Sequence, residues 1–485
     1  MDIDNDSLYF FIQTKEKIEM SHEKFMNSSI FLFLDLIVVA ASGWLYWLVI
    51  SKLVSASDVG QSTAVYSLVV LICTIVGLGL EYPLLKKSST ARSNIVGSAI
   101  LIELTITIAV VPFIIYTLED LHLEALQSYT MIALVMLISI SQGYVARYAL
   151  LGISASKTIL VIDTITTIVK FVAGYFLVLS GFGALGVLLS FMLQALLTAC
   201  VALSLVRNIF GFSPGGFKYI KDTFKEGIVN MPSIFSRTLI VSLSVVLLAS
   251  FGIASSEIGI FYIALMISVV AGGLISSMAY MVIPASSMTQ TDLTSGSIRI
   301  GISLTATIIA LLLTSPHFVL SLIGTEYVSG QILLMILGVG ILPFAVATNT
   351  VSRFNYLGMS RRLLFIGSLQ MIGFIVSFIL LVPPFKVVGA ALSILISYSV
   401  SCIPALIWSE KILLRYIANT AIAIIAGWGI SNIVRLSLPD GIINEITTLL
   451  TSIVVTMVII VALKNTSISE VRRLLKTVVN PTTSK

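Results

Sequence analysis

A series of long apolar runs constrains this chain more than any other feature. The 485 residues are 57% hydrophobic and only 11% charged, whereas a soluble protein carries about 25% charged residues. A membrane-spanning helix takes roughly 20 apolar residues, so the hydrophobic share corresponds to about fourteen helices. Transmembrane barrel strands would instead alternate polar and apolar residues over ~10 positions. The sequence therefore predicts an all-α polytopic membrane protein.

Fourteen spans can be placed along the chain, with tight hairpins expected at 180–183 and 383–386. No loop between spans is long enough to form a catalytic domain, so we expect a transporter and no enzyme. The spans lie near residues 30–50, 59–82, 94–117, 126–149, 158–180, 183–206, 228–251, 258–283, 298–318, 329–353, 362–382, 387–408, 412–434 and 443–463.

Lysine and arginine in the loops predict the orientation. With the N-terminus inside, 23 basic residues fall on the cytoplasmic side and only Lys52, Lys386 and Arg435 fall outside. This is the positive-inside bias of membrane proteins, and it explains most of the net charge of +5 without a nucleic-acid partner. We expect a multi-pass protein of the cell membrane with both termini in the cytoplasm.

The chain repeats itself after about 200 residues. Pairs of similar segments occur in the same order: "SDVG" (57–60) and "SEIG" (256–259), "RYALLGIS" (147–154) and "RFNYLGMS" (353–360), and "GVLLS" (186–190) and "GAALS" (389–393). The repeated unit has six helices. Because six is an even number, both copies insert the same way up and form parallel repeats related by an axis along the membrane normal.

This duplication predicts two pseudo-symmetric six-helix lobes with two extra helices. Because one chain supplies both lobes, we expect the protein to work as a monomer. Transporters place substrate sites at repeat interfaces near the membrane midplane, so alternating access by rocking of the lobes is expected. The predicted parts are a cytoplasmic N-terminal segment (1–29), an N-lobe (30–206), a cytoplasmic linker (207–227), a C-lobe (228–408), an appended helix pair (409–463) and a cytoplasmic tail (464–485).

Five ionisable side chains lie well inside spans: Asp35, Glu103, Asp163, Lys170 and Arg237. Each costs at least ~2.5–3.5 kcal/mol at mid-span, so none is expected to face lipid. We expect them to line a water-filled cleft between the lobes. Arg237 and Lys170 are the candidate substrate-binding residues, and Asp35, Glu103 and Asp163 are candidates for ion coupling or cavity lining. The alternative is structural pairing, for instance of Glu103 with Lys170.

One apolar stretch, "VIDTITTIVKFVAGYFLVLSG" (161–181), shows the pattern most clearly. Asp163 and Lys170 are seven residues apart, which is two helical turns, so both point the same way. Thr166 and Thr167 lie between them on that side. Arg147 is different, because it sits at a cytoplasmic helix end where the positive-inside rule already explains it.

Several classes of chemistry are excluded by the sequence. There is no GxxxxGK[ST] loop for ATP hydrolysis, and the three histidines lie outside the spans or at the outer end of one. The three cysteines sit apart in separate spans, with no metal or disulfide spacing. We therefore expect no metal and no cofactor, with transport driven by an H⁺ or Na⁺ gradient, the membrane potential or the substrate gradient.

Two segments resemble a known family. "KLVSASDVGQSTAVYSLVVLICTIVGLGLEYPLLKKSS" (52–89) and "SPHFVLSLIGTEYVSGQILLMILGVGILPF" (315–344) are similar to the first-to-second and ninth-to-tenth helix regions of polysaccharide and oligosaccharide-lipid flippases. That family belongs to the multidrug/oligosaccharidyl-lipid/polysaccharide exporter superfamily. The resemblance implies a V-shaped pair of six-helix bundles that flips an isoprenoid-diphosphate-linked glycan from the cytoplasmic to the outer leaflet. Relatives bind the diphosphate with basic residues of the central cavity, and the resemblance implies this role for Lys170 and Arg237.

A second function stays open within the same superfamily. The five buried charges sum to −1, with two basic and three acidic side chains, which is a poor match to a diphosphate. Ion-coupled multidrug antiporters, which export organic cations, resemble this chain in carrying an acid on the first helix, here Asp35. Their usual twelve spans favour the flippase over the antiporter.

Overall fold

The computed structural model describes residues 31–32, 34–88, 92–120, 126–211, 213, 217–289, 294–357, 359–408, 411–439 and 441–463. Within these ranges, the side chains of residues 82, 86–87, 92–93, 119–120, 126–128, 217–218, 226–239, 274–289, 294–300, 304, 352, 355–356, 360 and 411–413 lie outside the description. The described chain is helical and contains no strand, which confirms the all-α prediction.

The helices follow one another along the described chain in the following order. They are the first helix (Leu34–Ile50), α2 (Ala56–Val76), α3 (Glu81–Lys87), α4 (Arg92–Asp120), α5 (Leu126–Gly152), α6 (Ser156–Leu179), α7 (Gly183–Phe210), α8 (Phe217–Ser250), α9 (Ser255–Thr289), α10 (Thr294–Thr314), α11 (Pro316–Ser321), the 3₁₀ helix η1 (Thr325–Gly330), α12 (Gln331–Tyr356), α13 (Ser360–Ile407), α14 (Lys411–Ser437) and α15 (Ile442–Ala462).

The predicted number of spans agrees with these helices. Ten described helices are long and apolar enough to cross a membrane, and three shorter apolar helices join them. One of the ten, α13, changes direction at Lys386 and supplies two spans. Counting α13 twice and adding the three shorter helices gives fourteen crossing segments in the described part of the chain.

Both predicted hairpins have residues in the left-handed region. Between α6 and α7, Gly181 (φ 86°) and Gly183 (φ 49°) make the reversal. In α13 the reversal falls at Lys386 (φ 48°), and Gly389 then packs so closely that a Cβ atom would lie 2.2 Å from the Leu381 carbonyl oxygen. Only a residue without a side chain permits that approach.

One span differs from the prediction. The sequence favours a continuous helix over 59–82, but α2 ends at Val76 and α3 begins at Glu81. Between them Leu78 (φ 46°) and Gly79 (φ 70°) adopt left-handed conformations that interrupt the helix. The break therefore lies near the end of the predicted span, directly before Glu81.

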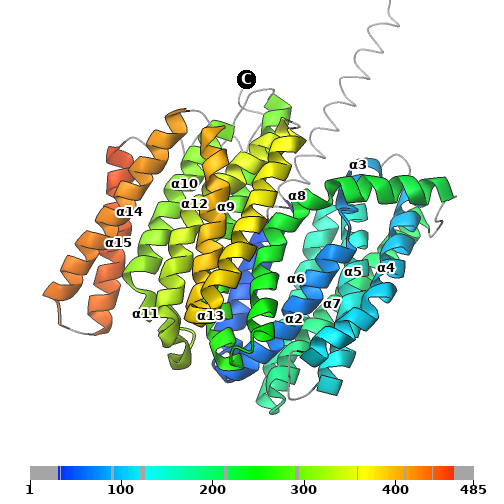
Figure 1. The fold of residues 1–485 in the computed structure, drawn as a ribbon, viewed down its shortest axis with the longest axis horizontal. Coiled ribbons are helices and arrows are strands. Elements are labelled where there is room, and N and C mark those ends of the chain that lie inside the picture. Colours follow the sequence, from blue (N-terminus) through cyan, green and yellow to red (C-terminus); the bar gives the residue numbers. More distant parts are fainter. Residues whose placement is uncertain are drawn as a thin grey trace, which may run out of the picture.

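The two halves of the chain form two groups of helices. Figure 1 shows α2 to α7 on one side and α9 to α13 on the other, with α14 and α15 at the far edge. In that view α8 begins as a stretch that runs across the upper ends of the N-terminal helices and then turns into the bundle (Figure 1). This arrangement confirms the prediction of two lobes with an appended helix pair.

The two copies of the repeated motif contact each other. A Cβ atom built at Gly60 of α2 would lie 1.8 Å from the carbonyl oxygen of Ser255 at the start of α9. Likewise, a Cβ atom at Gly259 would lie 2.0 Å from the carbonyl oxygen of Ala56. We call this pair of approaches the glycine contact, and the end of the bundle that holds it the glycine end.

Acidic residues of the same motif hold the two hairpins near the glycine contact. Asp58 accepts a hydrogen bond from the backbone N–H of Ala184 at 3.2 Å, next to the turn between α6 and α7. Glu257 pairs with Lys386 at 3.2 Å, at the turn within α13. In each lobe the acid of the motif therefore contacts the hairpin of the same lobe, as expected of two parallel repeats.

The appended helices pack through small polar residues. Asn444, Thr448, Ser452 and Thr456 recur every four residues on α15 and are all buried. Ser452 hydrogen-bonds Thr314 of α10 at 3.0 Å. In a membrane, such close polar contacts hold helices together while the apolar side chains face lipid, so α14 and α15 attach to the C-lobe through α10.

Candidate functional site

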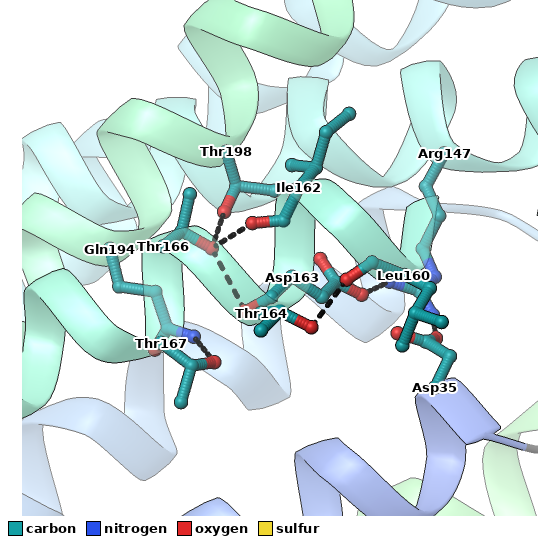
Figure 2. A network of polar contacts seen from close by, with 10 residues as sticks. All are labelled: Asp35, Arg147, Leu160, Ile162, Asp163, Thr164, Thr166, Thr167, Gln194 and Thr198. Carbon is teal, nitrogen blue, oxygen red and sulfur yellow. Dashed lines mark hydrogen bonds and ion pairs between the residues drawn. The ribbon is translucent and has the colours of Figure 1, made fainter. Parts of the chain in front are cut away.

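Arg147 joins three helices of the N-lobe. Its guanidinium extends from α5 and forms ion pairs with Asp163 of α6 and Asp35 of the first helix (Figure 2). The Asp35 side chain is 0% exposed, that of Asp163 is 10% exposed, and that of Arg147 is 25% exposed. Since arginine offers donors in a planar fork, one guanidinium can satisfy a carboxylate on each arm. We call these three residues the ion-pair cluster.

The polar stripe of α6 faces inward, as its spacing predicts. Asp163, Thr166, Thr167 and Lys170 are all buried. Figure 2 shows two of the contacts with α7: Thr198 donates to the hydroxyl of Thr166 at 3.0 Å, and Gln194 donates to that of Thr167 at 3.0 Å. Isoleucines on the opposite face of α6 are exposed and suited to contact lipid.

Lys170 lies between aromatic rings rather than beside an acid. Its Nζ is 5.1 Å from the ring centre of Tyr46 on the first helix and 5.2 Å from that of Phe191 on α7. The Tyr46 hydroxyl is fixed by a 2.7 Å hydrogen bond with Ser190. Lys170 is only 7% exposed, and no carboxylate of the described residues forms an ion pair with it. Cation–π contacts stabilise the ammonium group but leave its hydrogen-bond donors available.

The formal charges of these four residues balance. Asp35 and Asp163 carry two negative charges, Arg147 carries one positive charge, and Lys170 adds a second positive charge two helical turns away. Asp35 also has a carboxylate oxygen, Oδ1, that is buried without a hydrogen-bond partner in the described structure. Two of the three acids predicted to weaken an anion site are therefore held by Arg147, and Lys170 has no ion-pair partner among the described residues.

Glu103 lies apart from these residues. It is buried on α4 at 1% exposure and lines a cavity with Glu81, Tyr144 and Tyr148. The predicted pairing of Glu103 with Lys170 is absent among the described contacts. Arg237 belongs to α8, but its side chain lies outside the described residues.

Arg147 is the residue of this region that sequence reasoning missed, because its position at a helix end already explained its charge. A signal was present, because Asp35 and Asp163 both lie about five residues from their predicted cytoplasmic helix ends. Two acids at one depth, next to an arginine at a helix end, can meet when their helices pack side by side. The sequence does not give the rotation of each helix, so this meeting required the structure.

The described residues do not gather three or more His, Cys, Asp or Glu side chains in an arrangement able to hold a metal ion. The ion-pair cluster has only two acids, and its arginine occupies the place between them. The arrangement is therefore that of one guanidinium shared by two carboxylates.

Comparison with known proteins gives one family and one fold. The profile of the family described as "Polysaccharide biosynthesis protein" matches residues 25–290. The lipid II flippase MurJ, in an inward closed conformation, superposes with a TM-score of 0.70 at 13% identity, covering 89% of this chain and 97% of that chain. No curated protein sequence matches the chain.

Two transporters of the MATE family also share the fold. An inward-facing multidrug resistance transporter of the MOP superfamily superposes with a TM-score of 0.58 at 16% identity, covering 81% of this chain and 99% of that chain. VcmN of Vibrio cholerae superposes with a TM-score of 0.56 at 15% identity, covering 80% of this chain and 97% of that chain. At these identities, the similarity is one of fold.

Proposed function

The chain belongs to the polysaccharide biosynthesis protein family, and on that premise we propose that it is a flippase for a lipid-linked glycan. Its substrate is an isoprenoid-diphosphate-linked oligosaccharide or polysaccharide repeat unit. The protein moves this substrate from the cytoplasmic to the outer leaflet by alternating access of its two lobes. The fold of the exporter superfamily, inferred from sequence motifs and matched by solved structures, supports this reading.

The observation that carries the proposal is the environment of Lys170. A buried ammonium group with aromatic neighbours and no paired acid keeps its donors free for an anion. A diphosphate presents several charged oxygens, and its hydrogen bonds with a cation strengthen where water is excluded. Lys170 would bind the diphosphate from the N-lobe, and Arg237 would bind it from the C-lobe.

The ion-pair cluster supplies a means of coupling. Asp35 and Asp163 share one guanidinium, so the three residues together keep one negative charge. A proton or Na⁺ that neutralised one acid would loosen its hold on Arg147, and this change could bias the two states of the lobes. Coupling to an H⁺ or Na⁺ gradient, or to the membrane potential, would then drive transport.

The remaining features fit one orientation in the cell membrane. We place the glycine end outward and both termini in the cytoplasm, with the linker 207–227 at the inner surface. The lobes 30–206 and 228–408 would rock against each other, and 409–463 would lie beside the C-lobe. A monomer suffices, since the duplication supplies both halves of the pathway.

The proposal is tested by outward movement of a fluorescent diphosphate-linked glycolipid in proteoliposomes. Lys170→Met keeps the length of the side chain and removes its charge. We expect the initial rate to fall by about 10- to 100-fold, because a hydrogen bond to a charged group is worth ~1.5–3 kcal/mol. Lys170→Arg should retain more activity than Lys170→Met.

Lys52→Met is the matched control, since Lys52 lies exposed in the loop after the first helix. It should transport at the wild-type rate. Equal rates in the wild type and Lys170→Met would overturn the assignment of Lys170. Failure of the wild type to move the glycolipid would overturn the flippase itself.

An organic-cation antiporter is the second candidate, and the buried Asp35 favours it. Its free Oδ1 could take a proton or bind a cation in place of Arg147. The wild type would then exchange an organic cation for H⁺ or Na⁺, and Asp35→Asn would abolish the exchange. The same proteoliposomes, loaded with a fluorescent cation, separate the two candidates.

A further inference from the structure

A cavity with several polar side chains in its lining lies within the N-lobe, separate from the ion-pair cluster. It occupies about 120 Å³ and is bounded by α2, α3, α4 and α5. Its polar lining includes Glu103, Glu81, Tyr144, Tyr148 and Thr74. A single water needs only about 10–15 Å³ of such volume, so this space can hold an ion with several waters.

Glu103 is the unpaired group of the cavity. Glu103 is only 1% exposed, and its Oε1 has no hydrogen-bond partner in the described structure. Burying an ionised carboxylate without a partner carries a large cost in free energy. Glu103 must therefore either stay protonated or share its charge with a cation.

The broken helix beside Glu103 favours a cation. Gly77 and Gly79, in the break between α2 and α3, line the same cavity. Irregular backbone at membrane depth is tolerated where it lines a cavity, and unwound carbonyl groups are ligands for Na⁺ in transporters. The C-terminal end of α2 at Val76 adds the negative end of its helix dipole.

The charged side chains among the described residues that line the cavity are acidic. Its lining includes two glutamates but neither lysine nor arginine. Arg147 lies close enough to interact with Tyr144 and Tyr148, but two carboxylates already hold its guanidinium. Carboxylate, phenol, hydroxyl and carbonyl oxygens are the ligands of hard cations. Because the lining has only two acids, a monovalent ion suits it better than a divalent one.

We propose that this cavity binds a small monovalent metal cation, which Glu103 ligates directly. Thr74 and the carbonyl groups of the break between α2 and α3 complete its oxygen ligands, together with retained water. The inference stands on the cavity and does not depend on which substrate the protein carries.

Binding of radioactive ²²Na⁺ to the purified full-length protein in nanodiscs tests the proposal without any glycolipid. We expect saturable binding to the wild type and at least about a tenfold loss of affinity in Glu103→Gln, as for other disrupted ligand sets. Thr74→Val keeps the carboxylate and should weaken binding less. Glu257→Gln removes a carboxylate at the glycine end and should bind as the wild type does.

A thermal measurement gives a second readout. Replacing choline chloride with NaCl at constant ionic strength should raise the melting temperature of the wild type and leave that of Glu103→Gln unchanged. Absence of saturable binding to the wild type would overturn the proposal, as would equal binding in Glu103→Gln; Glu103 would then be a protonated structural group. Should Glu103→Gln fail to fold, equal binding by Thr74→Val and the wild type would count against the site.

Discussion

Replacing Gly60 with alanine should push α2 and α9 apart where the two lobes meet. The new Cβ atom would lie 1.8 Å from the Ser255 carbonyl oxygen, whereas ordinary van der Waals contact begins near about 3.5 Å. Since both atoms are fixed to the backbone, the helices must separate by roughly 1.5 Å. Overpacking costs about 1–3 kcal/mol, which lowers the population of the closed glycine contact by about 5- to 150-fold.

A crosslink across the glycine end would measure this separation. The backbone N–H of Ala56 on α2 donates to Glu326 of η1 at 2.8 Å, so these positions join the two lobes. In a background without the native cysteines, the pair Ser57→Cys and Glu326→Cys, next to this hydrogen bond and reachable from solvent, should react with a short bismaleimide. Adding Gly60→Ala should slow the reaction at least about fivefold.

Two further variants decide the interpretation. Gly43→Ala is the matched control, because a Cβ atom there would have nothing within 4 Å, and it should leave the crosslinking rate unchanged. Gly259→Ala should act like Gly60→Ala, since its Cβ atom would lie 2.0 Å from the Ala56 carbonyl oxygen. Equal rates in Gly60→Ala and Gly43→Ala would refute the role of the glycine contact in holding the lobes together.

Three other predictions concern stability and can be read from melting curves of the purified protein. Arg147→Met should destabilise by about 3–5 kcal/mol because it leaves two buried carboxylates unpaired; neutralising both acids as well should restore part of the loss, and purely additive effects would contradict the ion-pair cluster. Gly427→Ala should destabilise by about 1–3 kcal/mol, since its Cβ atom would lie 2.0 Å from the Thr456 hydroxyl, whereas Gly429→Ala, with nothing within 4 Å, should melt like the wild type. Lys386→Gly should stabilise by about 1 kcal/mol, because a left-handed backbone strains any other residue and its exposed ion pair contributes little; a lower melting temperature would argue against strain at that turn.

The sequence predicted what depends on periodicity along one helix. Asp163 and Lys170 were expected on the same side of their helix, and both are buried there with two threonines between them. Helix number and repeat symmetry were also predictable, because span length and duplicated segments are local properties of the chain. The turn at Lys386 fell within the hairpin expected at 383–386.

What the sequence could not predict depends on how helices rotate against one another. Arg147 looked like a charge at a helix end, yet its side chain reaches Asp35 and Asp163 on two other helices. Glu103 has the depth to meet Lys170 but faces a different set of helices. The break after Val76 was hidden as well, because glycines in an apolar run permit a break without requiring one.

The glycine contact also indicates how a duplicated molecule of this kind could arise from a dimer of six-helix units. Each copy of the motif touches the other copy, so the contact has the geometry of an isologous dimer interface, in which the same patch on each partner faces its twin. A free six-helix unit with this patch would be self-complementary and could pair before any fusion of two copies. Once fused, each half can change alone: the alignment of Gly186 with Gly389 places Gly373 opposite Lys170 and Ile366 opposite Asp163. An ancestral homodimer would carry its charges twice, whereas the fused chain keeps a symmetric frame and carries the counterparts of Asp163 and Lys170 as uncharged residues.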